Sequence, residues 1–161
     1  MPARWLRLLV AAPLLASGTV AGCASVERDC VAPVSGTVSY DGSSVPPPFH
    51  VEWTITLDGG RGRFEVTPGY GSMQRWGEDF RADPASVAAA CTEIVRAGEE
   101  EHPPPGSAVI TAELRDGSGR SVRRRAVATG SGDLFTAVKG AVPDATWTSV
   151  YGEYERWSDR Q

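Results

Sequence analysis

The first 23 residues constrain this chain most, because they set the compartment in which the remainder folds. Residues 1–7 carry two arginines and no acidic residue, and Leu8–Ala16 is a short apolar run. Small residues then lead up to Cys23. A basic start, a short apolar run and small residues before a cleavage point are typical of a secretory signal peptide. Because the apolar run is shorter than the roughly 20 residues that cross a bilayer, we predict a cleaved signal peptide over residues 1–22.

The four residues Val20-Ala21-Gly22-Cys23 resemble the lipobox of bacterial lipoproteins. Val20 stands where leucine is usual, whereas Ala21 and Gly22 fit the next two places. The resemblance implies cleavage before Cys23 and diacylation of its sulfur with fatty acids such as palmitate. Membrane lipid is then a partner of the protein, which is lipid-anchored at the extracytoplasmic face of the cell membrane. An ordinary signal peptide with an incidental cysteine and an uncleaved anchor are the alternatives.

Two further cysteines, Cys30 and Cys91, remain once Cys23 is assigned to lipid. Such a pair is usually oxidised outside the cytoplasm, and we predict a Cys30–Cys91 disulfide. A crosslink over about 60 residues stabilises a fold by about 4 kcal/mol in the chain-entropy model. Residues 23–29 then form a short lipidated tether that keeps the domain close to the membrane surface. Two free buried thiols are the alternative.

The rest of the chain has the size and charge of a small acidic domain. Removal of residues 1–22 leaves 139 of the 161 residues, which is enough for a single domain with a hydrophobic core, and we place that domain at 30–161. The same removal takes away two arginines and no acid, so the net charge changes from −4 to −6. An acidic chain of this kind argues against a nucleic-acid partner.

Alternation of apolar and polar residues is the main secondary-structure signal. It is clearest where Val51, Trp53, Ile55 and Leu57 are separated by polar residues. Such patterns between turn-forming residues predict strands over 34–40, 50–57, 63–67, 107–114 and 121–129. Residues 68–81 have no clear period, and we predict an irregular glycine-rich segment there.

One helix is well marked in the sequence. Asp83 suits the N-cap, Pro84 the first helical position and Gly98 the stop. Apolar residues then recur at helical spacing, at Val87, Ala90, Cys91 and Ile94. We therefore expect Cys91 to point inward.

Two later segments are candidates for helices. The first is a short helix that begins at Asp133. The second is 144–157, where apolar residues recur at helical spacing but several residue types favour a strand, and we predict a helix there. The whole pattern predicts an α+β fold, with a small antiparallel sheet packed by one firm helix and a candidate second.

Sequence motifs of catalysis are missing. The two histidines, His50 and His102, are 52 residues apart, and no H-E-x-x-H, C-x-x-C or G-x-S-x-G pattern occurs. We therefore predict a non-enzymatic protein with no cofactor and no metal site. An enzyme whose carboxylates are brought together by folding is the alternative.

Arginines are dense in the segment 115–125, which carries five of them. On a strand Arg123 and Arg125 share one face, whereas Arg124 faces the other way. In an acidic domain such a cluster is suited to anionic headgroups or phosphate-bearing polymers, and we name Arg120, Arg123 and Arg125 as the candidate contacts. The alternative is an edge strand that its charges protect from aggregation.

Aromatic residues in irregular sequence are a second candidate for partner binding. Tyr70, Trp76 and Phe80 lie in one glycine-rich segment, and Trp157 lies near the C-terminus. Exposed aromatic residues on loops suit a protein or glycan partner, and folding back over the core is the alternative.

The segments Val-Thr-Pro (66–68), Asp-Pro-Ala (83–85) and Ala-Ala-Cys (89–91) together resemble part of the subtilisin-inhibitor family. The resemblance implies strands before a disulfide-bearing helix and a hairpin after it, and a secreted serine-protease inhibitor as one function. This chain has no cysteine near Thr67 and none after Cys91, where that family staples its reactive loop. Our leading hypothesis is therefore an envelope lipoprotein with a binding or structural domain, whose partner is an envelope protein or an anionic polymer.

Overall fold

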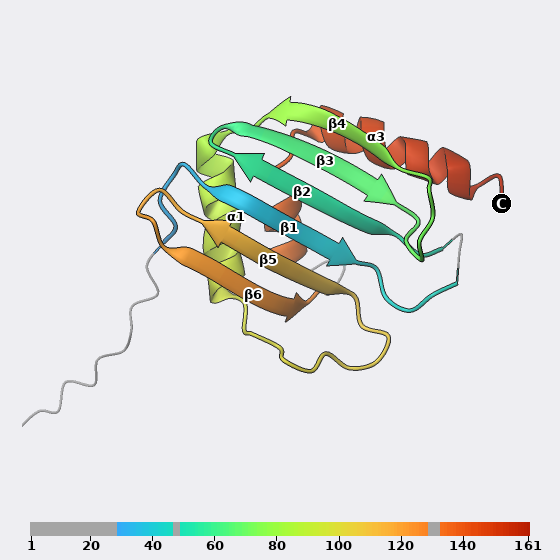
Figure 1. Ribbon diagram of the computed structural model, residues 1–161, viewed down its shortest axis with the longest axis horizontal. Helices are drawn as coiled ribbons and strands as arrows, with labels where there is room; N and C mark the ends of the chain where they lie inside the picture. The colour runs from blue at the N-terminus through green and yellow to red at the C-terminus, as the bar shows by residue number, and fades with distance from the viewer. Residues whose placement is uncertain (1–28, 47–48, 129–132) are drawn as a thin grey trace, which may run out of the picture.

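The computed structural model describes residues 29–46, 49–128 and 133–161, so the predicted signal peptide and Cys23 lie outside the described residues. The described residues form a six-stranded antiparallel sheet and three helices (Figure 1), which confirms the predicted α+β fold. The strands are β1 (Ser35–Asp41), β2 (Glu52–Asp58), β3 (Arg61–Thr67), β4 (Trp76–Arg81), β5 (Val109–Arg115) and β6 (Ser121–Val127). The helices are α1 (Pro84–Arg96), α2 (Asp133–Lys139) and α3 (Asp144–Ser158).

The sheet has the strand order β4-β3-β2-β1-β5-β6, and every neighbouring pair is antiparallel. Helices α1 and α3 lie behind the sheet in Figure 1 and cover one face only. The strands alternate accordingly, with buried Val38, Ile55 and Phe64 toward the helices. The other face carries polar side chains such as Thr56 in β2 and is here called the open face.

Helix α1 begins as its sequence predicts. Asp83 is the N-cap and accepts a hydrogen bond from the backbone N–H of Ser86 at 2.8 Å, and Pro84 occupies the first position. The predicted apolar stripe is buried, and Cys91 forms the predicted disulfide with Cys30. The disulfide joins the start of the described chain to the middle of α1.

The C-terminal segment is a helix because its aromatic stripe packs on the sheet. Trp147 stacks on Phe64 of β3 at 4.6 Å between ring centroids and meets Trp53 of β2 edge-on at 5.7 Å. Val150 and Tyr154 continue the stripe and are buried. Burial of this face outweighs the strand preference of the individual residues.

Strand β4 differs from the sequence-based prediction, because it lies in the segment expected to be irregular. Phe80 is buried, and its ring lies over Gly62 of β3 so closely that a Cβ at Gly62 would be 2.2 Å from it. Trp76 packs against Trp157 of α3 at 5.8 Å. Of the four aromatic residues considered for partner binding, three therefore pack on other parts of the fold, and Tyr70, although 59% exposed, lies against the ring of His50.

Candidate functional site

Arginines and carboxylates are unevenly distributed along the open face, although Asp58, Asp79 and Glu113 lie among the arginines. One end carries most of the arginines of this face and is here called the basic end: Arg61, Arg63, Arg81, Arg115 and Arg123. The other end carries carboxylates and is here called the acidic end: Asp41, Glu52 and Glu65. The separation follows from the antiparallel register, which brings the starts and ends of neighbouring strands to the same edge.

The basic end lies where the described chain enters the fold. The N–H of Gly117, in the β5–β6 turn, donates to the carbonyl of Val31 at 2.6 Å. Pro33 lines a small cavity together with Gly60, in the β2–β3 turn, and Ala82. Residues 29–33 thus run beside the turns that border the basic end (Figure 1).

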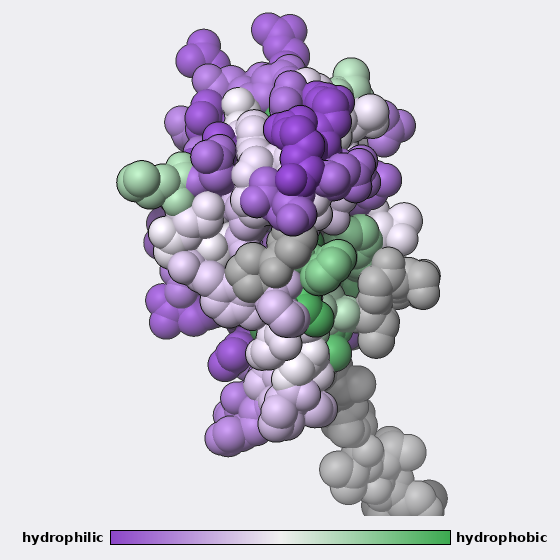
Figure 2. Space-filling view, turned by 90° about the vertical axis from the view of Figure 1, so that its right-hand side faces the viewer, coloured by the Kyte–Doolittle hydropathy of each residue, from purple (hydrophilic) through white to green (hydrophobic). Residues whose placement is uncertain are grey.

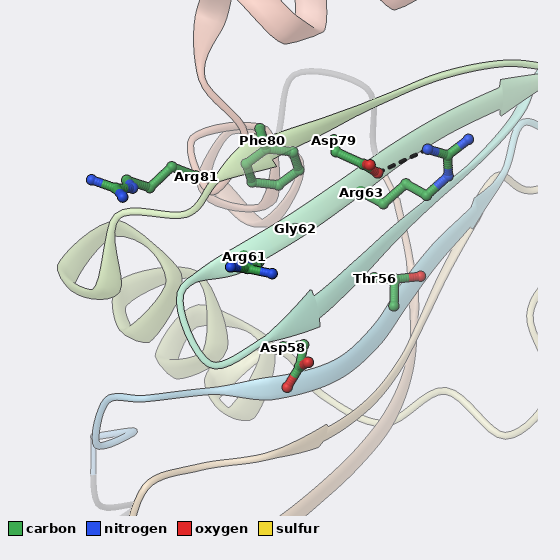
Figure 3. Close-up of a pocket in the computed structure, with 8 residues that line it drawn as sticks. All are labelled: Thr56, Asp58, Arg61, Gly62, Arg63, Asp79, Phe80 and Arg81. Carbon is green, nitrogen blue, oxygen red and sulfur yellow. Dashed lines mark hydrogen bonds and ion pairs between the residues drawn. The ribbon is translucent and has the colours of Figure 1, made fainter.

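A cavity of about 560 Å³ opens on the basic end and is here called the arginine cavity. Eight residues from β2, β3 and β4 line it (Figure 3): Thr56, Asp58, Arg61, Gly62, Arg63, Asp79, Phe80 and Arg81. Arg63 already has carboxylate partners, because its Nη1 donates to Asp79 at 2.8 Å and its Nε lies 3.5 Å from Glu65. The hydrogen bond that Asp79 accepts from Arg63, with the nearby Glu65 charge, raises the pKa of the Arg63 guanidinium.

Arg61 and Arg81 are direct cross-strand partners in this cavity. Both side chains are exposed, and neither forms an ion pair or a side-chain hydrogen bond with any residue that the structure describes. Figure 3 shows the two side chains splayed apart, with Arg81 extending away from the cavity. Like charges placed directly opposite on a sheet destabilise it, and the carboxylate of Asp58, the cross-strand partner of Arg61 in β2, offsets part of this repulsion.

The acidic end has the same type of like-charge pair with the opposite sign. Asp41 and Glu52 are direct cross-strand partners, and a cavity of about 360 Å³ opens beside them. The buried ring of His50 faces both carboxylates, with its Nε2 3.0 Å from Glu52 and 3.9 Å from Asp41. Its Nδ1 lies 2.6 Å from the carbonyl oxygen of Ser43. Both ring nitrogens of His50 thus lie within reach of oxygen acceptors, and the ring links the carbonyl of Ser43 to the carboxylate of Glu52.

Neighbouring backbone and aromatic groups hold His50 in place. The Tyr70 ring lies over the imidazole at 4.3 Å between centroids, and a Cβ at Gly69 would be 2.4 Å from the His50 ring. The Tyr154 hydroxyl of α3 donates to the His50 carbonyl at 3.1 Å. The side chain that contacts both carboxylates of the acidic end is therefore fixed in the folded structure.

Exposed apolar side chains gather at the same end of the molecule as the carboxylates. Figure 2 views this end and shows an apolar patch near its centre. Among the described large apolar side chains, Phe49 is 74% and Met73 98% exposed. Nothing in the described part of the chain covers either side chain fully.

The three predicted arginines do not lie together. Arg123 and Arg125 share the open face of β6 as predicted, and the Nε of Arg123 lies 3.4 Å from Glu113. Arg120 instead points toward the disulfide, with its Nη2 3.2 Å from the sulfur of Cys30 and its Nε 3.4 Å from Asp116. Arg120 is therefore positioned to support the fold at the basic end, whereas the other two remain candidates for surface contact.

Asp116 is a structural residue at the basic end that the sequence analysis did not single out. Its carboxylate accepts hydrogen bonds from the Ser118 hydroxyl and the backbone N–H groups of Ser118 and Arg120, and a longer one from the N–H of Val31. The bond from the Ser118 hydroxyl is the main cause that lowers the pKa of Asp116. An aspartate opening an Asp-Gly-Ser-Gly turn is the sequence signal that points to this role.

The described residues were also searched for a metal site and for helices that could span a membrane. Within the described ranges no three or more His, Cys, Asp or Glu side chains are arranged to hold a metal ion, and His102 is exposed. None of the helices in the same ranges has the length and apolar character needed to span a bilayer.

No protein-family model, characterised protein or solved structure matches this chain significantly. The resemblances to lipoproteins and to subtilisin inhibitors therefore stay predictions.

Proposed function

We propose that this protein is a lipid-anchored envelope protein whose domain is a non-enzymatic binding module, with the open face as its binding surface. The observation that carries the proposal is the position of the basic end beside the chain entry. Cys30 is crosslinked to α1, and the carboxylate of Asp29 accepts from Arg96 at 2.8 Å. The fold therefore begins only six residues after Cys23.

The length of that connection supports contact between the basic end and a membrane. Six residues span at most about 20 Å when fully extended. An acylated Cys23 would keep the domain within this distance of the lipid headgroups. Basic side chains near an anionic surface contribute about 1 kcal/mol each, and the attraction decays within a Debye length. Anchoring and the arginines of the basic end would thus act together.

Metabolic labelling with a clickable fatty acid tests the anchor. We expect the wild-type chain to incorporate label and to pellet with membranes, and Cys23→Ala to lose both properties. Cys30→Ala/Cys91→Ala is the matched control, because it removes two cysteines and leaves the predicted acylation site intact. An unlabelled wild-type protein that retains Met1 would overturn the anchoring part of the proposal.

Vesicle cosedimentation tests the binding surface separately. With the full-length Cys23→Ala chain at low salt, we expect Arg123→Ser/Arg125→Ser to weaken binding to phosphatidylglycerol vesicles relative to phosphatidylcholine vesicles. Arg156→Ser/Arg160→Ser removes the same charge from the C-terminal end of α3 and should change binding less. Equal binding by both double variants would contradict the assignment of the open face.

A further inference from the structure

We propose that Arg61 and Arg81 form a binding site for the phosphate group of a hydroxyl-bearing phosphate ester, such as a glycerol phosphate. The site is the arginine cavity, where both residues line about 560 Å³ of space on the open face. This inference deepens the binding function proposed above and rests on the open face being the binding surface. It does not depend on acylation of Cys23.

The charges of the cavity leave these two guanidinium groups available. Asp79 and Glu65 are both directed to Arg63, at 2.8 and 3.5 Å. The register places Arg61 and Arg81 side by side, and their side chains splay apart in Figure 3 and form no ion pair within the described ranges. Asp58 is the cross-strand partner of Arg61 on its other side and forms no ion pair with it. The two guanidinium groups are therefore available to an external anion.

The remaining lining groups define the class of anion. A guanidinium presents a planar fork of donors that matches phosphate oxygens, and a pair of them suits a phosphate group. The Asp58 carboxylate is exposed at the edge of the cavity, where it repels a second anionic group and accepts hydrogen bonds from hydroxyls. The Thr56 hydroxyl offers one further donor or acceptor.

These groups together fit a ligand with one phosphate and neighbouring hydroxyls. The cavity volume lies within the range of roughly 300–1,000 Å³ typical of small-molecule sites. Two sources carry this chemistry, namely a soluble polyol phosphate and the headgroup of phosphatidylglycerol. Because the basic end lies beside the chain entry, both sources are within reach of the cavity.

Isothermal titration calorimetry of the full chain in detergent tests the site with sn-glycerol 3-phosphate as the probe. We expect Arg81→Gln to weaken binding about tenfold and Arg61→Gln/Arg81→Gln to abolish it, as expected for the loss of charge-assisted hydrogen bonds. Arg160→Gln makes the same charge change outside the cavity and should leave binding unchanged. Equal affinity in the double variant and in Arg160→Gln would overturn the proposal.

A second pair of probes tests the role of Asp58. Wild-type protein should bind sn-glycerol 3-phosphate more tightly than methyl phosphate, which lacks the hydroxyls, and Asp58→Asn should lose most of this preference. An unchanged preference in Asp58→Asn would overturn the assignment of a hydroxyl-bearing ligand.

Vesicles distinguish the two sources of the phosphate. If the headgroup is the ligand, phosphatidylglycerol vesicles compete with sn-glycerol 3-phosphate at matched ionic strength, and Arg61→Gln/Arg81→Gln no longer shows that competition. If the ligand is soluble, vesicles do not compete and the calorimetric binding stands. Absence of binding in both arms would reject the site, even where fatty-acid labelling of Cys23 succeeds.

Discussion

Each end of the open face has a pair of like-charged residues that lie directly opposite on neighbouring strands, and the two pairs differ in what contacts them. At the acidic end, Asp41 and Glu52 lie directly opposite, and the buried His50 contacts both carboxylates. At the basic end, Arg61 and Arg81 lie directly opposite and form no ion pair with a described residue, although Asp58 is the cross-strand partner of Arg61 on its other side. The carboxylates of the acidic end thus have a buried side chain in contact with them, whereas the two guanidinium groups of the basic end are exposed to solvent.

The two ends also differ in what holds the backbone. A disulfide and the hydrogen bonds of Asp116 secure the chain at the basic end. Hydrogen bonds and ring contacts of His50 secure the acidic end. Because the disulfide and Asp116 hold the backbone of the basic end, the side chains of Arg61 and Arg81 are available to bind a ligand.

The largest expected effect is loss of the crosslink behind the basic end. Cys30→Ala/Cys91→Ala should lower the free energy of unfolding by about 4 kcal/mol, because the unfolded chain is no longer closed into a large loop. Urea denaturation of the variant and of the reduced wild type measures this loss. An unchanged midpoint would show that the crosslink does not secure this end.

The next largest effect is at the acidic end. His50→Ala should cost about 2–4 kcal/mol, because it leaves a cavity and removes the hydrogen-bond partner of Glu52, which faces Asp41. The exposed His102→Ala is the control and should change stability by less than about 0.5 kcal/mol. Similar midpoints for the two variants would mean that the contacts of His50 do not stabilise the acidic end.

Removal of one charge from each like-charge pair should have opposite signs. Glu52→Gln should destabilise the domain by about 1 kcal/mol, because His50 loses its carboxylate partner. Arg81→Gln should stabilise it by about 0.5 kcal/mol in phosphate-free buffer, since repulsion from Arg61 is relieved and no partner is lost. Thermal unfolding at low ionic strength measures both changes. Stability changes of the same sign in the two variants would contradict the difference between the two ends.

The smallest expected effect is that of Asp116 on the free energy of unfolding at acid pH. Hydrogen bonds, chiefly from Ser118, lower the pKa of Asp116 below its ordinary value of 3.8. The stability that this carboxylate contributes is therefore complete above pH 3.8 and is lost as the pH falls through the lower folded pKa. Denaturation between pH 2 and pH 5 should show a shallower acid limb in Asp116→Asn than in wild type, and identical slopes would contradict the assignment.

The fold was largely predictable from local sequence, except where burial depends on a distant partner. The cap at Asp83 and the stripe of α1 are encoded within one helix, and both are confirmed. Strand β4 was missed because only Trp76 and Phe80 are apolar in it, and their partners lie on α3 and at Gly62. An edge strand of this kind has no alternation strong enough to identify it.

The candidate site was predictable only in part. Arg123 and Arg125 share a face because alternation within one strand puts them there. The opposition of Arg61 and Arg81 depends on the β3–β4 register, which no local pattern in the sequence specifies. The position of Arg120 was not predicted, because it contacts Cys30, which is far away in the sequence, as well as the nearby Asp116.

The most direct test of an anion site at the basic end is the thermal midpoint of the wild type and of Arg61→Gln/Arg81→Gln, with and without sn-glycerol 3-phosphate at constant ionic strength. Ligand at ten times its dissociation constant should raise the wild-type midpoint by about 5 °C and leave that of the double variant unchanged. The double variant should also unfold at a higher temperature than the wild type when no ligand is present. A wild-type midpoint that does not respond to the ligand, or an equal response in both proteins, would contradict the account.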